Sequence, residues 1–296
     1  MNASNAAIAV RVEPPLRERT LRLRDGRALH VSEWGPERGR PVLFCTGAAT
    51  SGSLGFASSE LLARLGLRLL GIDRPGLGGS DPHEEKTLGT FAEDVGPVLG
   101  SPDAVAVGFS QGAPFAVSLA SAGHVCAVAI VSGQDELSHP LVRPRLHPDV
   151  AGMVDAVLRD PAGFERHFSG MATRDGLWDL IVSTSAACDR ALYVSEPFRT
   201  AFLRALDEGF AHGAHAYARD LVNAISPWPF AVEAVSVPVD LWYGARDTSP
   251  VHSPDFGATL ASRLPNARRF LLEEEGGALL WTRAEQILSA LLEHRA

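Results

Sequence analysis

A serine between two glycines is the residue of this 296-residue chain best suited to covalent chemistry. The segment 108–112 reads Gly-Phe-Ser-Gln-Gly, follows the apolar run 104–107 and precedes the helix-like segment 113–120. A sharp turn from a strand into a helix crowds the backbone, and glycine relieves the crowding because it has no Cβ. The hydroxyl of Ser110 would then stand above a sheet, at the positive end of the following helix. The spacing therefore predicts a nucleophile rather than a simple Gly/Ser turn.

Apolar runs that alternate with helix-like segments must position this serine. Runs that read as strands occupy 19–23, 28–33, 41–45, 67–72, 104–107, 125–131, 237–243 and 268–272. Segments that read as helices occupy 61–65, 91–99, 113–120, 256–264 and 284–292. This alternation is typical of α/β proteins in which helices cover both faces of a mostly parallel, doubly wound sheet.

The pattern changes between residues 136 and 233, where helix signals continue and no clear strand occurs. We therefore expect a sheet core in two parts, 1–135 and 234–296, with an inserted helical lid over 136–233. No apolar stretch is long enough to span a bilayer.

Composition limits the classes of partner. The formal net charge of −8 argues against a nucleic-acid surface. The three cysteines show neither metal spacing nor a disulfide framework, so we expect the reducing cytoplasm and neither a metal nor another cofactor. The expected partner is a small molecule with an apolar part. The sequence leaves the oligomeric state open.

Three landmarks stand at the ends of predicted strands. Segment 73–80 reads Asp-Arg-Pro-Gly-Leu-Gly-Gly-Ser, the serine turn follows at 108–112, and segment 244–247 reads Gly-Ala-Arg-Asp. In order and position they resemble the α/β-hydrolase family along nearly the whole chain. The resemblance implies that Ser110 is the nucleophile and that Asp247 is the acid that orients a catalytic histidine.

The resemblance also implies an oxyanion hole formed by the backbone N–H groups of Ala48 and Gln111. The family often has His-Gly at the first of these turns, where this chain has Thr46-Gly47. The change leaves the backbone donors intact.

The chain departs from the family at the catalytic histidine. The family places it in the loop after the last strand, and here that position is occupied by Gly277. No histidine lies between His252 and His294. Serine needs a base to accept its proton as it attacks, and imidazole suits this role because its pKa is near neutrality. If Asp247 and Ser110 are correctly placed, Gly277→His should raise ester turnover.

Two other histidines are candidates for a substitute base. His252 lies five positions after Asp247 in the adjoining loop, and His139 lies at the entry to the predicted lid. The simplest interpretation of His252 is a polar residue near the start of the next helix. The sequence does not distinguish a native glycine at position 277 from an introduced one.

Three functions are consistent with these residues. The first is a serine hydrolase of an ester, thioester, lactone or amide, with an incomplete or relocated triad. The second is a non-hydrolytic protein that binds a small apolar ligand. The third is a lyase or cyclase that uses the same pocket. A serine nucleophile argues against haloalkane dehalogenase or epoxide hydrolase chemistry, because those relatives attack with aspartate.

Overall fold

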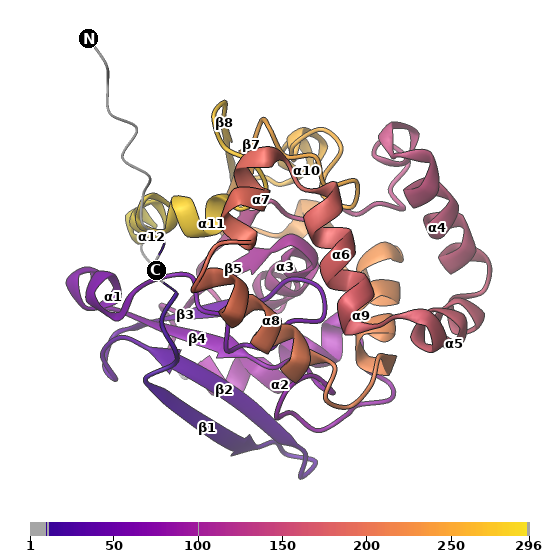
Figure 1. The fold of residues 1–296 in the computed structure, drawn as a ribbon. Helices are drawn as coiled ribbons and strands as arrows, with labels where there is room; N and C mark the ends of the chain where they lie inside the picture. The colour runs from indigo at the N-terminus through magenta and orange to yellow at the C-terminus, as the bar shows by residue number, and fades with distance from the viewer. Residues whose placement is uncertain (1–9, 11, 100, 295–296) are drawn as a thin grey trace.

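An eight-stranded sheet with the order β1-β2-β4-β3-β5-β6-β7-β8 forms the centre of the molecule (Figure 1). The computed structural model describes residues 10, 12–99 and 101–294. β2 runs antiparallel to β1 and β4, and the pairings from β4 through β8 are parallel. The strands are β1 (Arg17–Arg22), β2 (Ala28–Trp34), β3 (Arg40–Cys45), β4 (Leu67–Ile72), β5 (Val105–Phe109), β6 (Ala127–Val131), β7 (Val239–Gly244) and β8 (Ala267–Leu272). The predicted α/β class with a mostly parallel sheet is confirmed.

Helices cover both faces of this sheet, as a parallel sheet with continuous apolar strands requires. One face packs against α1 (Ser59–Leu65), α11 (Leu279–Thr282) and α12 (Ala284–Glu293). The other face packs against α2 (Leu88–Leu99), α3 (Ala113–Ser121) and α10 (Ala258–Arg263). All five residues of β5 and all five of β6 are buried. These central strands are therefore fixed from both sides.

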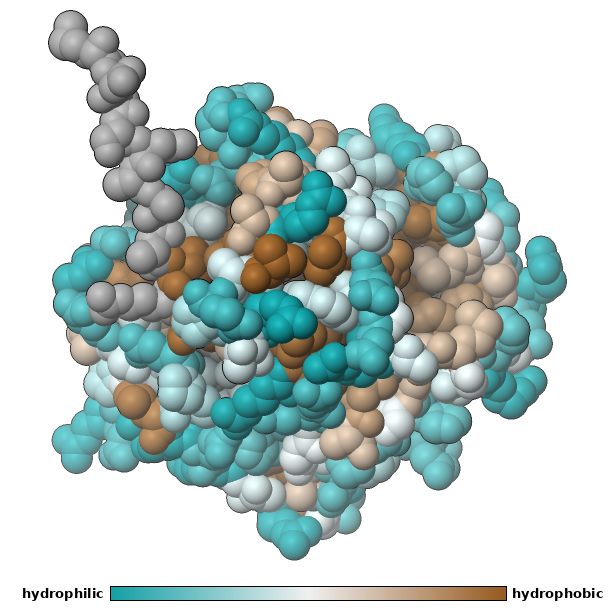
Figure 2. Space-filling view, in the orientation of Figure 1, coloured by the Kyte–Doolittle hydropathy of each residue, from teal (hydrophilic) through white to brown (hydrophobic). Residues whose placement is uncertain are grey.

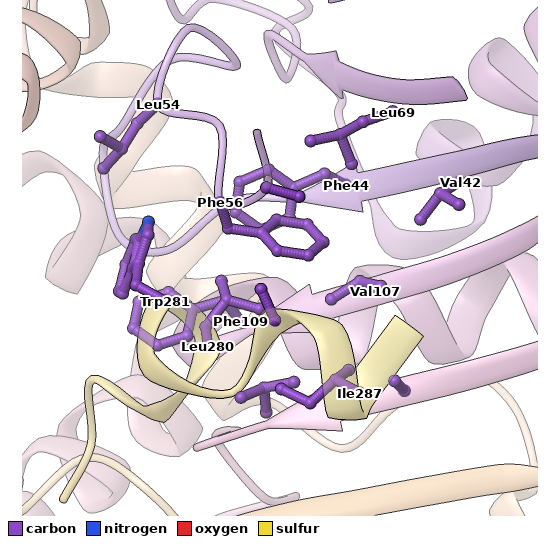
Figure 3. Packing of buried hydrophobic residues seen from close by; sticks show 14 of the residues in the cluster. Val42, Phe44, Leu54, Phe56, Leu69, Val107, Phe109, Leu280, Trp281 and Ile287 are labelled. Atoms are coloured by element: carbon purple, nitrogen blue, oxygen red, sulfur yellow. The ribbon is translucent and has the colours of Figure 1, made fainter. Parts of the chain in front are cut away.

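The chain turns back onto the sheet at its C-terminal end. Figure 3 shows Leu280, Trp281 and Ile287 pointing toward Phe44 and Val107 on the strands. Burial of each such side chain stabilises the fold by about 1.5–3 kcal/mol. This packing holds the loop that precedes α11 next to the ends of the central strands.

Helical structure alone occurs between residues 136 and 233, all of which the structure describes. The elements are η2 (Arg143–Arg145), α4 (Pro148–Arg159), α5 (Pro161–Met171), α6 (Arg174–Thr184), α7 (Ala187–Tyr193), α8 (Phe198–Gly209), α9 (His215–Ile225) and η3 (Val232–Ala234). They lie together on one side of the molecule (Figure 1). The domain boundaries and the action of this block as a lid stay predictions. In the part of the chain described, no helix has the length and apolar character needed to cross a bilayer.

Candidate active site

Ser110 lies at a strained turn between β5 and α3, on the short helix η1 (Ser110–Gly112). Its φ of +50° is rare for a residue with a side chain, and such strain is common where function requires it. A β-carbon at position 112 would overlap the carbonyl oxygen of Cys45, and one at 108 would lie 2.8 Å from the Cβ of Ala116. Both glycines of the motif are thus required by close packing.

The hydroxyl of Ser110 contacts an imidazole. Nε2 of His252 lies 2.9 Å from Oγ of Ser110. On the other side of the ring, Nδ1 lies 2.6 Å from Oδ2 of Asp247. The second carboxylate oxygen, Oδ1, accepts a hydrogen bond of 2.9 Å from the backbone N–H of Ser249. These contacts have the nucleophile–base–acid order of a catalytic triad.

The loop after β7 supplies both Asp247 and His252, and long-range contacts fix its course. The residue after the histidine, Ser253, donates its N–H to the carbonyl of Gly133 at 3.0 Å. Its hydroxyl donates to Oδ2 of Asp135 at 3.1 Å. Asp135 is fully buried, and this burial raises the pKa of its carboxyl to about 6. The loop that carries His252 is therefore tied to the chain just beyond β6.

Position 277 brings no imidazole to the site. A β-carbon at Gly277 would lie 2.9 Å from Oδ1 of Asp247. The backbone N–H groups of Gly277 and Ala278 donate to Asp189 on α7, at 2.8 and 2.9 Å. Burial raises the pKa of the Asp189 carboxyl. The loop where the family carries histidine is instead bound by a carboxylate from the helical block.

His139 lies elsewhere. Its Nδ1 accepts a hydrogen bond of 3.3 Å from the backbone N–H of Leu141, and the residue is absent from the pocket lining that the described residues form. Of the two histidines expected as substitute bases, the structure brings His252 to Ser110 and leaves His139 outside the pocket.

The two residues expected to supply the oxyanion donors, Ala48 and Gln111, line the same pocket as Ser110. Among the described residues, the N–H of Ala48 makes no hydrogen bond outside the helices and strands. The carbonyls of the same two peptide groups are engaged: Gly47 O accepts from Arg74 at 2.9 Å and Ser110 O accepts from Gln134 N at 3.0 Å. The role of the two N–H groups as oxyanion donors stays a prediction.

The pocket lies between the strand ends and the helical block. Its apolar lining comes from both parts of the chain: Phe44, Leu54, Phe109 and Trp281 from the core, and Met153, Phe168, Leu177, Leu180, Ile181, Phe202 and Leu221 from the helices. Leu180 on α6 is 52% exposed, so the lining reaches the outer surface. Figure 2 shows apolar side chains gathered on the face where α6, α7 and α8 lie. Such a pocket suits a ligand with an apolar part.

Two buried glutamines add polar groups to this lining. Nε2 of Gln134 and Oε1 of Gln111 have no hydrogen-bond partner among the described residues, although both side chains are only 3% exposed. A buried unpartnered polar atom is costly, and a ligand that supplied its partner would remove that cost. Sequence reasoning did not identify Gln134 or Asp189, because neither belongs to a local motif.

Comparison with known proteins shows the family of this chain. A family model described as "alpha/beta hydrolase fold" matches residues 40–283. The chain belongs to the α/β-hydrolase fold family. The match includes the serine turn, the loop after β7 and the position held by Gly277.

Solved structures of several α/β-hydrolases are similar to this chain. An esterase from Exiguobacterium antarcticum has 18% identity and a TM-score of 0.64, over 93% of this chain and 97% of the other. A bromoperoxidase from Bacillus anthracis has 22% identity and a TM-score of 0.66, over 94% and 99%. An enol-lactonase from Burkholderia xenovorans LB400 has 18% identity and a TM-score of 0.62, over 93% and 99%. At these identities the likeness establishes the fold, and function must be argued from the site.

Proposed function

We propose that this α/β-hydrolase is a serine hydrolase of ester-type bonds, in which His252 replaces the histidine that the family carries at position 277. The observation that carries the proposal is the pair of contacts at 2.9 Å and 2.6 Å that join Ser110, His252 and Asp247. A base within about 2.6–3.2 Å of the proton that it removes meets the geometric requirement for general-base catalysis.

The chemistry follows from the two nitrogens of one ring. Asp247 favours the tautomer in which Nδ1 of His252 carries the proton and donates a hydrogen bond to the carboxylate. Nε2 is then free to accept the proton of Ser110. As Oγ of Ser110 bonds to the substrate carbonyl carbon, its proton passes to Nε2. The carbonyl oxygen becomes an oxyanion, which the N–H groups of Ala48 and Gln111 would stabilise.

Collapse of this intermediate breaks the bond to the leaving group, which takes the proton from Nε2 of His252, and an acyl ester remains on Ser110. Water then attacks that ester while His252 accepts one of its protons. The second collapse returns the proton to Oγ and releases the acid. Each proton taken up by the ring is given back within the same half-reaction, so no cofactor is required.

The alternative of a binding protein without hydrolysis loses its main support, since it depended on the absence of a base. No observation favours a lyase or cyclase over acyl transfer. The substrates that fit best are small esters, thioesters, lactones or amides with an apolar part, because apolar side chains dominate the walls around Ser110.

A panel of p-nitrophenyl esters tests the proposal. We expect turnover by the wild-type protein, an acyl adduct on Ser110 by intact mass, and loss of both in Ser110→Ala. Uncharged alkyl esters should be preferred over esters with a charged acyl group, because an unpaired charge in an apolar pocket is strongly disfavoured. Equal turnover by Ser110→Ala, or equal use of charged and alkyl esters, would contradict the proposal.

A further inference from the structure

A fully buried cluster of charged side chains lies beneath the turn that carries Ala48. Arg74, which follows β4, donates from Nη1 to the carbonyl of Thr46 at 2.7 Å and from Nη2 to the carbonyl of Gly47 at 2.9 Å. Its Nε donates to Oδ2 of Asp220 at 2.7 Å. Both side chains of this ion pair are 0% exposed. One guanidinium thus joins two consecutive carbonyls of the turn to a carboxylate on α9.

The third charged member of the cluster is Lys86, the only lysine in the chain. Its Nζ lies 2.6 Å from Oδ1 of Asp220 and donates to the carbonyl of Pro75 at 2.8 Å. Asp220 therefore contacts both buried basic side chains through its two carboxylate oxygens. Buried ion pairs contribute little net stability, because desolvation of the charges offsets their attraction. Stability alone is a weak reason for such a cluster at this place.

The contact with Gly47 acts directly on a proposed oxyanion donor. The carbonyl oxygen of Gly47 and the N–H of Ala48 belong to the same peptide group, so a bond to one end fixes the direction of the other. A charge-assisted hydrogen bond to the oxygen also polarises the peptide and makes its N–H a stronger donor. The guanidinium thus fixes and strengthens the N–H of Ala48, the proposed oxyanion donor.

The turn needs an external support of this kind. Ala49 has a φ of +48°, a conformation that is unfavourable for a residue with a side chain. Within the turn, Thr46 donates its hydroxyl to Thr50 O at 2.8 Å, and Thr50 returns a longer bond of 3.3 Å to Gly47 O. In the part of the chain that the structure describes, this longer bond is the one other hydrogen bond to the carbonyl of Gly47 besides that of the guanidinium.

We propose that Arg74 is a positioning residue of the oxyanion hole, and that Asp220 couples helix α9 of the 136–233 block to that hole through it. This inference rests on the proposed function, since it assumes that Ala48 N–H stabilises an oxyanion. The contact between α9 and Arg74 then fixes the position of the Ala48 N–H group that stabilises the oxyanion.

Two conservative variants test the coupling. Arg74→Lys keeps the charge but replaces the planar guanidinium, whose Nε, Nη1 and Nη2 each bind a different acceptor, with a single ammonium nitrogen. Asp220→Asn keeps the shape and an acceptor but removes the counter-charge. Arg268→Lys and Asp240→Asn are matched controls, because Arg268 binds the fully buried Asp240 with bonds of 2.7 and 2.8 Å at a place outside the pocket. Active sites in each sample are counted by fluorophosphonate titration, so that unfolded protein does not enter kcat.

The measurements are kcat, KM and the inhibition constant of an aryl trifluoromethyl ketone, whose serine adduct carries an oxyanion. In Arg74→Lys and Asp220→Asn we expect kcat per titrated site to fall, and the ketone to bind more weakly, by roughly 10- to 100-fold, less than the roughly 100- to 1000-fold cost of removing a donor outright. KM should stay close to wild type, because the interaction is made in the transition state. The two controls should lose thermal stability alone.

Wild-type kcat and ketone affinity in folded Asp220→Asn or Arg74→Lys would overturn the inference while leaving the proposed function intact. Asp220→Asn is isosteric and decides the outcome if Arg74→Lys does not fold. Absence of Ser110-dependent turnover in the wild type would instead contradict the proposed function, and the inference with it.

Discussion

The backbone of Gly277 lies directly against the carboxylate of Asp247. A β-carbon at position 277 would sit 2.9 Å from Oδ1 and 3.1 Å from Oδ2. Both oxygens are in use, since Oδ1 accepts from Ser249 and Oδ2 contacts His252. A side chain at position 277 would therefore press on a carboxylate whose two oxygens are both already bound.

We therefore expect Gly277→His to lower turnover, the reverse of what the sequence predicts. The new Cβ would displace Asp247 and weaken its contact with His252, which would cost at least roughly tenfold in kcat, up to the roughly 10⁴-fold loss seen when a triad acid is replaced. Ester turnover per titrated site measures the effect.

Gly170→His on α5 is a suitable control, because a β-carbon there meets nothing within 4 Å. This variant should retain wild-type turnover. A gain in turnover for Gly277→His would mean that an imidazole at position 277 is a more effective base than His252. This result would contradict the prediction.

The acid of the triad should matter nearly as much as the base. We expect Asp247→Asn to lower kcat by about 10⁴-fold, because the amide no longer favours the tautomer with a free Nε2 on His252. Asp149→Asn serves as the comparison, since the side chain of Asp149 is 93% exposed at the start of α4. Steady-state kinetics measure kcat of both variants. Similar values of kcat for Asp247→Asn and Asp149→Asn would contradict a catalytic role of Asp247.

Asp135 should make stability depend on pH. Its folded pKa of about 6 lies above the unfolded value of 3.8, because burial disfavours the charged form. Between these values the folded state holds a proton that the unfolded state has released, so the free energy of unfolding falls as pH rises. The loss is complete above about pH 6, and a shift of about two units corresponds to roughly 3 kcal/mol at most.

Asp135→Asn resembles the neutral carboxyl and should remove this penalty. Urea unfolding should find the variant more stable than wild type at pH 8, with a difference that disappears near pH 4. A constant difference at the two pH values would show that the Asp135 carboxyl is not the titrating group.

Local patterns were sufficient to predict the frame of the site. The strand expected at 237–243 corresponds to β7 (Val239–Gly244), and the serine turn falls between β5 and α3 as its glycines indicate. These features depend on periodicity and on close packing between neighbours in the chain. The family match likewise agrees with the landmarks read from the sequence.

The contacts that complete the site join distant segments, so the spacing to Asp247 made His252 one of two candidate bases and could not single it out. His252 reaches Ser110 across 142 positions, and Asp189 meets Gly277 across 88. Arg74 finds Asp220 across 146 positions, although the arginine itself lies in a recognised motif. The spacing of residues in the sequence does not indicate such pairs, because they depend on how the loop after β7 and the helical block pack on the sheet.

The rate at which a fluorophosphonate labels Ser110 tests the relocated triad most directly, because phosphonylation needs the same base as acylation. Intact-mass kinetics would compare wild type with His252→Ala and His139→Ala. We expect labelling of Ser110 at equal rates in wild type and His139→Ala, and a rate at least about 10³-fold lower in His252→Ala. Labelling of folded His252→Ala at the wild-type rate would contradict this expectation.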